Sequence, residues 1–337
     1  MKTFLIIASA AKNGGALTII NKFIEWAGTK KYKFVVVAPK IFVPIKTNIF
    51  HIEIKTSNIL SPFFTLFCSL FFIIKYKPDI SISFNNLPIL FSFFFKTKSY
   101  TYFHNLDLAT ENNFKSIIYR FLIKNFSDEI IVQTPYTKKI IKSFFKKKIN
   151  LIWPGILYYK NKKKNFDERK IFMTNSKIFL YPVSDVLIKN KNFEFILKFS
   201  KFFISNAIKI VIPCNPPEFL PKNSNEFLIF MGNVEHQEMM QIYKKCYATL
   251  FLSFQESYGL PIYESLFNSK PVFVLKKDYI KYNLNYFKKD PLLILFSENK
   301  FEKTLLNYLR QNNLKKNKIN AKLSKQYLYD NWSVLLK

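Results

Sequence analysis

Short apolar segments alternate with longer amphipathic segments along both halves of the chain, and this alternation restricts the possible folds more than any other feature. An apolar run at Lys2–Ser9 is followed by a helical pattern at Ala16–Ala27 and by another apolar run at Lys33–Ala38. The second half repeats this order, for example in Ala248–Leu252 and Pro261–Asn268. Strands that alternate with helices form a parallel sheet covered on both faces. The sequence therefore predicts an α/β protein.

The predicted elements fall into two halves around a charged segment. Lys160–Lys170 reads KNKKKNFDERK and holds a single large apolar side chain, so it is typical of a linker. We expect a first Rossmann-like domain at 1–158, a linker at 159–170, a second Rossmann-like domain at 171–320 and a C-terminal helix at 321–337. Further strands are predicted at 80–84, 99–103, 129–133, 177–181, 207–212, 227–230 and 272–275. Further helices are predicted at 59–75, 114–125, 135–145, 193–204 and 237–246, and throughout the part after 275.

The positive charge of the chain does not indicate a nucleic-acid partner. The formal net charge is +30, but the arginines are limited to Arg120, Arg169 and Arg310, whereas proteins that read nucleic acids rely on arginine for bidentate contacts. With 49% hydrophobic residues, the chain can fill folded cores. We expect a folded protein that its charge draws toward an anionic membrane surface.

Two features bear on the compartment. The cysteines, Cys68, Cys214 and Cys246, lie far apart without CxxC spacing, which favours a reducing environment over a disulfide framework or a zinc site. The N-terminal MKTFLIIASAAKN resembles a short signal peptide, but its apolar run is brief and a Gly-Gly turn and a helical pattern follow it. We interpret it as the first strand.

The first domain contains two segments rich in phenylalanine, Ile59–Ile74 and Leu87–Phe95. Ile59–Ile74 has sixteen residues, fewer than the roughly 20 that cross a bilayer, so it is expected to form a buried or an interfacial helix. Two interpretations stay open. The aromatic residues are core positions of a phenylalanine-rich protein, or part of this surface, with the lysines between Lys138 and Lys148 nearby, docks on an anionic membrane.

Glycine is scarce, so each glycine points to a backbone requirement. Gly14 and Gly15 lie between the first predicted strand and helix, where a glycine turn opens amides toward a phosphate. Gly259 lies in SFQESYGLPIYESL, ahead of Pro261, which suits the first position of a helix. The amides of Tyr258, Gly259 and Leu260 would then gather at a helix N-terminus that favours a pyrophosphate.

Two carboxylates flank this predicted anion site. Glu256 lies in the loop before the helix and Glu264 in its first turn. A carboxylate can accept hydrogen bonds from sugar hydroxyls, and a simple helix cap would not need two such groups.

This segment resembles the E-x7-E signature of the family four retaining glycosyltransferases of the surface-polysaccharide type, which have the GT-B fold of two Rossmann-like domains facing across a cleft. Glu256 and Glu264 have the family's spacing, and SYGLP stands for the usual G-F-G-L-P. Where the family usually has an arginine near the lysine of the second domain, Ser184–Ile188 offers none, although Lys189 is close by.

The likeness extends over most of the chain in the order of its motifs. Gly14-Gly15 falls at the family's Gly-Gly loop, Phe103-His104-Asn105 at its strand-end histidine, and Lys191-Asn192 at its K-N pair. The remaining similar segments are Asp128–Thr134, Ile152–Gly155, Tyr181-Pro182, Met231-Gly232-Asn233 and Asp330–Ser333, the last of which resembles the end of a helix that crosses back to the first domain.

The resemblance implies a role for each matched residue. Glu264 would accept hydrogen bonds from the nucleotide ribose, Glu256 would face the donor sugar, and the amides of Ser257, Tyr258, Gly259 and Leu260 would hold the pyrophosphate together with Lys191. From the first domain, Gly14 and Gly15 would close on the donor phosphates or on the acceptor, and His104 would contact the donor sugar near the reacting carbon. The family uses no metal and no cofactor.

We therefore expect a retaining hexosyltransferase (type EC 2.4.1) that moves a sugar from a UDP- or GDP-linked donor to a glycan or lipid-linked acceptor in surface polysaccharide synthesis, such as lipopolysaccharide, O-antigen or capsule. It would be cytoplasmic and peripheral on the inner face of the cytoplasmic membrane. Two alternatives stay open. A GT-B nucleotide-sugar epimerase would form no new glycoside, and a non-catalytic, lysine-rich membrane or polyanion binder on a degenerate transferase fold would ignore nucleotide sugars.

Overall fold

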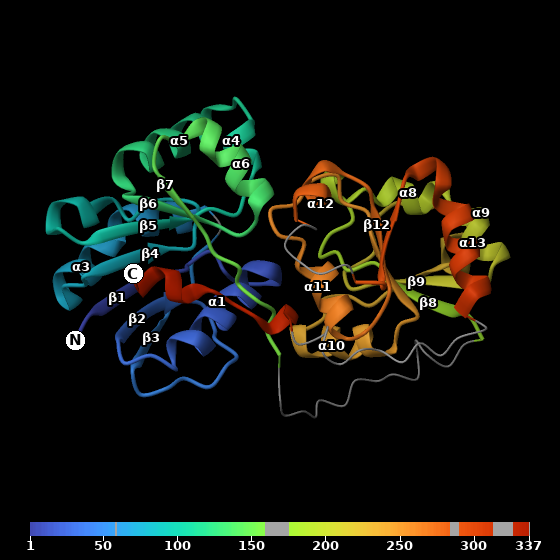
Figure 1. Ribbon diagram of the computed structural model, residues 1–337, viewed down its shortest axis with the longest axis horizontal. Coiled ribbons are helices and arrows are strands. Elements are labelled where there is room, and N and C mark those ends of the chain that lie inside the picture. The colour runs from blue at the N-terminus through green and yellow to red at the C-terminus, as the bar shows by residue number, and fades with distance from the viewer. Residues whose placement is uncertain (58, 159–174, 284–289, 313–325, 337) are drawn as a thin grey trace. The chain divides into compact units, whose positions relative to one another are not determined.

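The computed structural model describes residues 1–57, 59–158, 175–283, 290–312 and 326–336 (Figure 1). The chain forms two compact units, Met1–Leu157 with Tyr329–Lys337, and Tyr158–Leu328. The predicted linker at 159–170 lies outside the described residues, as do residues 321–325 of the predicted C-terminal helix. The two units are described separately below.

The first unit is built on a parallel sheet whose strand order is β3-β2-β1-β4-β5-β6-β7. Its strands are β1 (Thr3–Ile7), β2 (Lys33–Ala38), β3 (Ile49–Glu53), β4 (Ile80–Ser83), β5 (Lys98–Tyr102), β6 (Glu129–Val132) and β7 (Lys148–Leu151). Its helices are α1 (Gly14–Ala27), α2 (Leu60–Phe63), the π-helical turn η1 (Phe64–Cys68), α3 (Ser69–Tyr76), η2 (Leu90–Phe95), α4 (Asp107–Thr110), α5 (Phe114–Phe126), α6 (Pro135–Phe144) and the C-terminal η8 (Trp332–Leu336).

Side chains that alternate along the strands fill a core on each face of this sheet. Phe4, Ile6, Phe34 and Val36 pack against α1 on one face, and Leu5, Ile7, Val35 and Val37 pack against α3 on the other. Strands buried on both faces read as continuous apolar runs, which is how β1 and β2 read in the sequence.

The C-terminal segment completes the first core. Trp332 is fully buried and meets Phe23 of α1 edge to face, with ring centroids 5.1 Å apart. The Trp153 amide donates to Asn331 Oδ1 at 2.5 Å, and Asn331 Nδ2 donates to the Leu151 carbonyl. The end of the chain therefore belongs to the first unit, as the predicted fold class requires, although Trp332–Leu336 is a 3₁₀ helix rather than an α-helix.

The second unit repeats the architecture with the parallel strand order β10-β9-β8-β11-β12-β13. Its strands are β8 (Lys177–Leu180), β9 (Ile208–Ile212), β10 (Leu228–Phe230), β11 (Ala248–Phe251), β12 (Val272–Leu275) and β13 (Leu293–Phe296). Its helices are η3 (Lys189–Lys191), α8 (Phe193–Lys198), α9 (Ser200–Ser205), η4 (Ser224–Glu226), α10 (His236–Lys245), α11 (Leu260–Phe267), α12 (Asp278–Asn283), η6 (Glu298–Lys300), α13 (Phe301–Asn312) and η7 (Gln326–Leu328).

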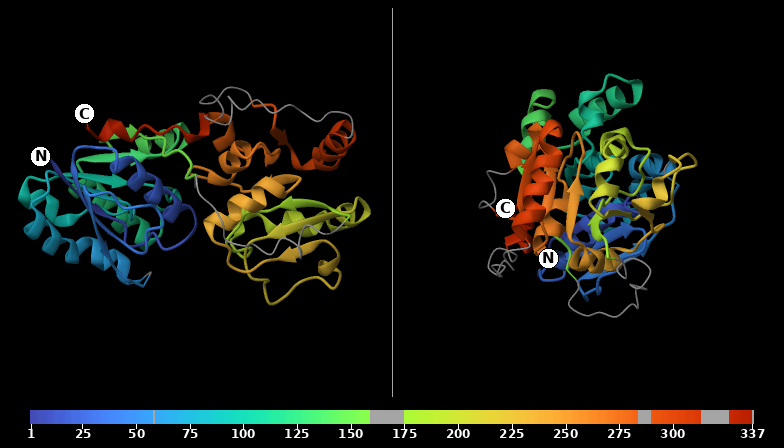
Figure 2. Two further views of the ribbon diagram at one scale, coloured as in Figure 1. Left: turned by 90° about the horizontal axis from the view of Figure 1, so that it is seen from below. Right: turned by 90° about the vertical axis from the view of Figure 1, so that its right-hand side faces the viewer.

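The second sheet is also covered on both faces. Phe179, Ile208, Ile210 and Leu250 pack against α8, α9 and α13, whereas Ile178, Leu180 and Val211 pack against α10. The turned views in Figure 2 show helices packed against the strands of the sheets. Two parallel, helix-covered sheets confirm the predicted α/β fold class.

Several predicted boundaries are wrong. The segment after 275, expected to be helical throughout, contains β13, a short apolar strand that pairs with β12. The edge strands β3 and β7 were not predicted. The helix expected at 193–204 is divided into α8 and α9 at Phe199. The missed strands β3, β7 and β13 have only four or five residues and lie at sheet edges, and local patterns reveal such short elements poorly.

Candidate functional site

The predicted donor residues of the second unit lie where its strand order changes direction. Strands β8 and β11 are neighbours in the sheet. The chain runs from β8 to β9 on one side and from β11 to β12 on the other, so the two connections lead away in opposite directions. Such a switch point leaves an opening at the carboxyl ends of the strands, where open α/β sheets bind ligands. Lys191 follows β8, and Glu256 to Leu260 follow β11. The sequence motifs thus come from the two strands that border this opening.

The N-terminus of α11 has the geometry expected of an anion-binding turn. Gly259 is its N-cap residue, with φ of +75° in the left-handed region, and Pro261 stands in the first turn. A Cβ on Gly259 would lie 3.3 Å from Ile262 Cδ1, so both the backbone conformation and the packing favour glycine. A glycine cap carries no side chain with which to satisfy the first amides of the helix. Those amides and the helix dipole are suited to a phosphate.

Lys191 and Glu256, which the sequence analysis assigned to two different motifs, form an ion pair. Lys191 Nζ lies 2.5 Å from Glu256 Oε1, and both side chains are largely buried. The pair brings a cation and a carboxylate together beside Ser257 and Tyr258 at the start of the predicted phosphate loop. A diphosphate at this loop would compete with Glu256 for the ammonium group.

Asn190, which sequence reasoning missed, holds the two loops together. Its Nδ2 donates to the Gln255 carbonyl at 2.7 Å, and its Oδ1 accepts from the Gln255 amide at 2.9 Å. The Phe254 amide donates to the Asn190 carbonyl at 2.9 Å. Asn190 therefore fixes the position of Lys191 relative to Glu256. Its place next to Lys191 was the available signal, because an asparagine in a loop can bridge two backbone segments.

Glu264 is paired with a second residue that sequence reasoning missed. His236 Nε2 lies 2.7 Å from Glu264 Oε1, and the carboxylate is almost completely buried. His236 begins α10, which packs against α11. Burial and the charge of Glu264 raise the pKa of the neighbouring Tyr243. His236 was noted in the sequence only as one of three histidines, and nothing local linked it to a residue 28 positions away.

In the first unit, Gly14 and Gly15 also lie at a switch point. Strand β1 has β2 on one side and β4 on the other. The two glycines open α1 after β1, and Gly14 has φ of +57°. A Cβ built on either glycine meets no described atom within 4 Å, so the space beside them is open. Another chemical group could therefore approach the backbone of both glycines closely.

His104 follows β5 in the first unit and is held by Asn86, which follows β4. Asn86 Oδ1 accepts from the amides of His104 and Asn105 at 2.7 and 3.0 Å. This fixes the orientation of the amide, so Asn86 Nδ2 donates to His104 Nε2 at 3.2 Å. Burial lowers the pKa of His104 from its ordinary value of 6.5 to about 4, against a hydrogen bond to the Tyr102 backbone that raises it. The imidazole is therefore neutral at pH 7.

The structure brings some of the predicted residues together and leaves others apart. Lys191 and Glu256 are in direct contact, and Ser257, Tyr258, Gly259 and Leu260 continue the same loop. Glu264 lies on the helix that follows, beyond the first turn in which it was predicted because α11 already begins at Leu260, and has its own partner, His236. Gly14, Gly15 and His104 belong to the other unit, where they lie at the carboxyl edge of the first sheet. Their roles remain predictions.

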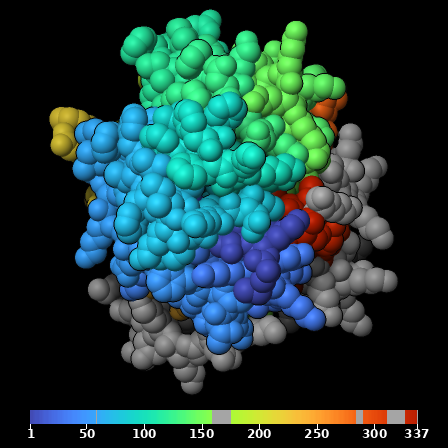
Figure 3. Space-filling view, turned by 90° about the vertical axis from the view of Figure 1, so that its left-hand side faces the viewer, coloured from blue at the N-terminus to red at the C-terminus, as the bar shows by residue number. Residues whose placement is uncertain are grey.

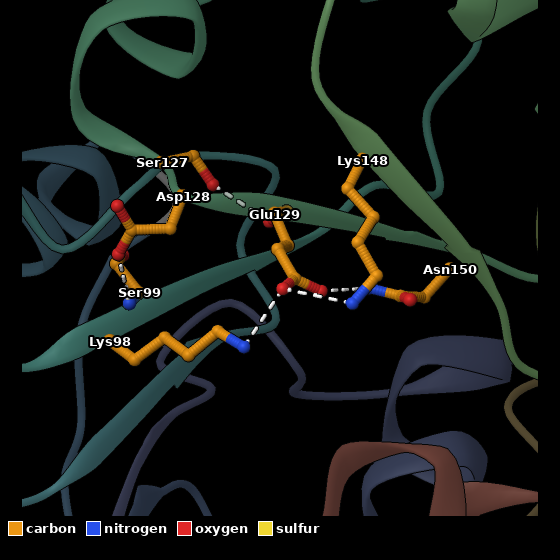
Figure 4. Close-up of polar contacts among 7 residues, drawn as sticks. All are labelled: Lys98, Ser99, Ser127, Asp128, Glu129, Lys148 and Asn150. Carbon is orange, nitrogen blue, oxygen red and sulfur yellow. Dashed lines mark hydrogen bonds and ion pairs between the residues drawn. The ribbon is translucent and has the colours of Figure 1, made fainter. Parts of the chain in front are cut away.

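A cluster of charged residues lies at the opposite, amino edge of the first sheet (Figure 4). Glu129 Oε1 lies 2.8 Å from Lys98 Nζ and 3.2 Å from Lys148 Nζ, and Asn150 Nδ2 donates to Glu129 Oε2 at 2.7 Å. Burial acts to raise the pKa of Glu129, but these three hydrogen bonds outweigh it and hold the pKa below its ordinary value. The cluster ties the starts of β5, β6 and β7 together and is structural.

Two hollows also open at amino edges rather than beside the predicted loops. One, of about 500 Å³, is lined by Lys177, Lys245 and Lys270 at the start of strands in the second unit. The other, of about 380 Å³, lies beside Lys33 and Asn48 in the first unit. Neither coincides with a residue matched to the glycosyltransferase motifs, and ligand sites of open parallel sheets lie at the carboxyl edge. The candidate site therefore rests on the loops after β8 and β11.

Comparison with known proteins identifies the fold. No protein-family model matches the sequence, and no curated protein matches it. Solved structures do. Sucrose-phosphate synthase of Thermosynechococcus elongatus aligns with a TM-score of 0.75 at 12% identity, over 99% of this chain and 96% of that one.

Two other similar structures cover nearly the whole chain. The HepE protein of Anabaena, solved with UDP-glucose, aligns with a TM-score of 0.68 at 12% identity, over 97% of this chain and 96% of that one. WaaG, a glycosyltransferase of lipopolysaccharide biosynthesis, aligns with a TM-score of 0.66 at 12% identity, over 96% and 94%. The chain has the GT-B fold of these proteins.

The same fold also occurs in a different reaction class. A putative UDP-N-acetylglucosamine 2-epimerase of Listeria monocytogenes aligns with a TM-score of 0.60 at 14% identity, over 96% of this chain and 91% of that one. Because one fold can carry several chemistries, the activity has to be argued from the site.

Proposed function

We propose that the protein is a glycosyltransferase that moves a hexose-type sugar from a nucleotide-diphosphate donor to a glycan or lipid-linked acceptor. One observation carries the proposal. The glycine-capped N-terminus of α11, the Lys191–Glu256 pair and the buried Glu264 occupy neighbouring loops at one switch point of the second sheet. This is the set of groups that a nucleotide sugar needs, namely donors for the diphosphate and carboxylates for hydroxyl groups.

In this proposal the charge that develops on the leaving diphosphate is met by the protein itself. The amides at the start of α11 and the Lys191 ammonium group donate to the phosphate oxygens, and fixed donors of this kind stabilise a leaving group as its charge grows. Glu256 would turn from Lys191 to the sugar hydroxyls, and Glu264 would accept from the ribose. Transfer would retain the anomeric configuration and would need no metal.

Several similarities support the finer assignment. HepE was solved with UDP-glucose, and WaaG acts in lipopolysaccharide biosynthesis. Together with the family motifs, they favour a UDP-linked or GDP-linked donor and a role in surface polysaccharide synthesis. The acceptor would be presented at the inner face of the cytoplasmic membrane, where the protein is peripheral.

The test is product analysis with the full chain. The protein is incubated with UDP-glucose, UDP-N-acetylglucosamine or GDP-mannose, with and without a lipid extract of bacterial membranes, and the products are followed by NMR. A new glycoside with the donor's anomeric configuration, formed only with the extract, is the expected result. Conversion of the donor sugar without the extract would show the second candidate, an epimerase, which the Listeria likeness favours.

A matched pair of variants assigns the product to the site. Glu264→Gln removes the buried carboxylate, whereas Glu298→Gln changes an exposed carboxylate of the same unit that pairs only at the surface with Lys198. Product formation should fall at least about tenfold in the first variant, since one charged hydrogen bond is lost, and stay unchanged in the second. Equal activity of the two variants would contradict the assigned site.

A further inference from the structure

The helical segment α2–η1–α3, residues Leu60–Tyr76, exposes an apolar stripe, although Phe72 and Ile73 of α3 are buried in the core. Ser61, Thr65 and Ser69 form a hydroxyl stripe that is at most 2% exposed, whereas Phe63, Phe67 and Phe71 are between 47% and 60% exposed. A surface helix ordinarily buries its apolar stripe and exposes its polar one. This segment buries its hydroxyl stripe beside its core residues, and hydrogen bonding inside the unit explains why a second apolar stripe faces outward.

The buried hydroxyls are bonded to the edge of the sheet, which fixes the orientation of the segment. Ser61 Oγ lies 2.7 Å from Ser9 Oγ, after β1, and Asn85 Nδ2, after β4, donates to Thr65 Oγ1 at 2.7 Å. Asn85 Nδ2 also donates to Ser9 Oγ at 2.8 Å. Rotating the segment to hide its phenylalanines would leave these buried groups without partners, which is costly. The outward rings are therefore a fixed feature.

The neighbouring element η2 also buries a hydroxyl group and exposes aromatic rings. Ser92 is buried and shares a 2.7 Å hydrogen bond with Ser81 of β4, whereas Phe93 and Phe94 are 67% and 68% exposed. Element η2 packs against both η1 and α3. Phe91 links the two sets of rings, with its centroid 6.5 Å from Phe67 and 6.3 Å from Phe94.

Helix α5 extends the surface on the other side of η2, against which it packs. Ser116 is buried, whereas Phe114 is 80% exposed and Ile117 and Phe121 are also exposed. In Figure 3 the light-blue to cyan atoms of residues 60–98 adjoin the green atoms of the α5 region on one side of the first unit. We call this surface the phenylalanine face. It consists of Ile59, Leu60, Phe63, Phe67, Phe71, Ile74, Phe93, Phe94, Phe95, Phe114, Ile117 and Phe121.

The charges on these elements all have one sign. Segments 59–77, 87–98 and 114–126 contain no aspartate or glutamate. Exposed lysines are present in each of them, namely Lys75, Lys77, Lys96, Lys115 and Lys124, whereas Lys98 is paired with Glu129. Lys75 Nζ lies 5.5 Å from the centroid of the exposed Phe71 ring. Apolar rings beside lysines are the composition of a surface that enters the interface of an anionic bilayer.

This charge pattern also argues against a second copy of the chain as the partner. Two phenylalanine faces placed together would bring lysine against lysine with no carboxylate from the same segments to pair with them, and like charges at an interface oppose association. An anionic bilayer satisfies both features, because its headgroups attract the lysines and its acyl boundary takes up the rings. None of the helices in the described ranges has the length and apolar character needed to cross a membrane.

We propose that the phenylalanine face docks on the surface of an anionic lipid bilayer, with the exposed rings at the acyl boundary and the lysines at the headgroups. The inference rests on the proposed function, in which a membrane presents the acceptor, and adds which surface of the protein makes the contact. It assigns the first unit the task of holding the enzyme beside that acceptor.

The test is flotation of the full chain with vesicles of phosphatidylcholine alone or with added phosphatidylglycerol. Phe93→Ser/Phe94→Ser removes two outward rings, and Phe219→Ser is the control, since Phe219 is even more exposed, at 90%, but belongs to the second unit. We expect binding to the anionic vesicles to fall about tenfold or more in the double variant, because two ring burials are lost, and to be unchanged in the control. Unfolding midpoints of all three proteins show whether the fold is kept.

A second set of variants separates docking from general charge attraction. Lys75, Lys96, Lys115 and Lys124 are changed together to glutamine, and the control set is Lys222, Lys244, Lys281 and Lys303 of the second unit, which are also exposed. A larger loss of vesicle binding in the first set supports the proposal. Equal losses in the two sets, or unchanged binding of Phe93→Ser/Phe94→Ser, would overturn it.

Two further readouts distinguish the remaining outcomes. A concentration-dependent dimer in sedimentation that the double variant abolishes, without vesicle binding, would overturn the proposal in favour of a second copy of the chain. Stabilisation by UDP or GDP, measured on the same proteins without vesicles, reports on the donor site alone. Loss of vesicle docking with intact nucleotide binding would therefore count against the docking surface alone. Loss of nucleotide binding with intact docking would count against the proposed function alone.

Discussion

His236 Nε2 lies 2.7 Å from Glu264 Oε1. His236 is the first residue of α10, and Glu264 lies within α11, which packs against α10. The carboxylate is almost completely buried, so the imidazole provides the partner that a buried carboxylate requires. In the proposed site Glu264 accepts from a ribose hydroxyl. His236 would then be a positioning residue for the nucleotide.

Removing that partner should weaken nucleotide binding. In His236→Ala the Glu264 carboxylate loses a hydrogen bond worth about 1–3 kcal/mol, so the Kd for the preferred nucleotide should rise between a few-fold and about a hundredfold. Isothermal titration calorimetry measures this, and His236→Gln, which can still donate, should recover part of the affinity. His51→Gln, a histidine change in the first unit, is the control. Unchanged affinity in His236→Ala would show that the pair does not serve the site.

The loop glycines should differ sharply in their tolerance of alanine. Gly259→Ala places a side chain at φ of +75° and 3.3 Å from Ile262 Cδ1, which should cost about 1–3 kcal/mol of unfolding free energy. Gly15→Ala meets no described atom within 4 Å and has an ordinary helical backbone, so its stability should be unchanged or slightly increased. Urea unfolding compares the two. Equal destabilisation would contradict the backbone conformation described here.

Gly15→Ala also tests the predicted role of the first unit. If the loop after β1 closes on the donor phosphates or the acceptor, the added methyl group lowers turnover while leaving stability intact. Turnover with the donor found by product analysis measures this. Wild-type turnover would remove Gly15 from the predicted site.

His104 should make stability depend on pH in a defined window. Its pKa is lowered from 6.5 to about 4, so between these values the unfolded chain binds a proton that the folded chain does not. Unfolding free energy therefore falls as pH drops from about 6.5 to about 4, by on the order of 1–3 kcal/mol. His104→Gln should flatten this slope in urea titrations at several pH values. An identical slope in wild type and His104→Gln would contradict the lowered pKa of this imidazole.

The Glu129 cluster should contribute to stability and not to activity. Glu129→Gln loses the charge that holds Lys98 and Lys148, and should cost about 1–3 kcal/mol at pH 7. Because the pKa of Glu129 is lowered in the folded protein, its contribution is complete above the ordinary pKa and disappears as pH falls through the lowered value. The difference from wild type should therefore shrink in strong acid. Glu53→Gln, on the exposed edge of the same sheet, is the matched control.

Local patterns predicted much of the fold and some of the local geometry around the candidate site. Gly259 and Pro261 could be assigned to a helix start because cap residues act within one turn, and this helix begins at Leu260. The pairing of Lys191 with Glu256 agrees with two motifs that were matched independently. His236 and Asn190 were missed because each acts on a residue brought near only by the packing of α10 on α11 or of one loop on another.

The phenylalanine segments show a different limit. Ile59–Ile74 was left open between a core helix and a membrane surface, since an apolar run alone does not say which side faces out. The available signal for which side faces out is the spacing of Ser61, Thr65 and Ser69, four residues apart, which places the hydroxyls on one stripe. That this stripe is the buried one depends on Ser9 and Asn85, which come from two other loops.

The account's central claim is that the loops after β8 and β11 bind a nucleotide, and thermal unfolding tests it most directly. Wild type, Glu264→Gln and Glu298→Gln are unfolded with UDP, GDP, ADP or CMP at a hundred times the expected Kd, where a bound nucleotide adds about 2.7 kcal/mol. We predict that UDP or GDP stabilises wild type and Glu298→Gln and has little effect on Glu264→Gln. Stabilisation of all three proteins alike, or of none by any nucleotide, would contradict the claim.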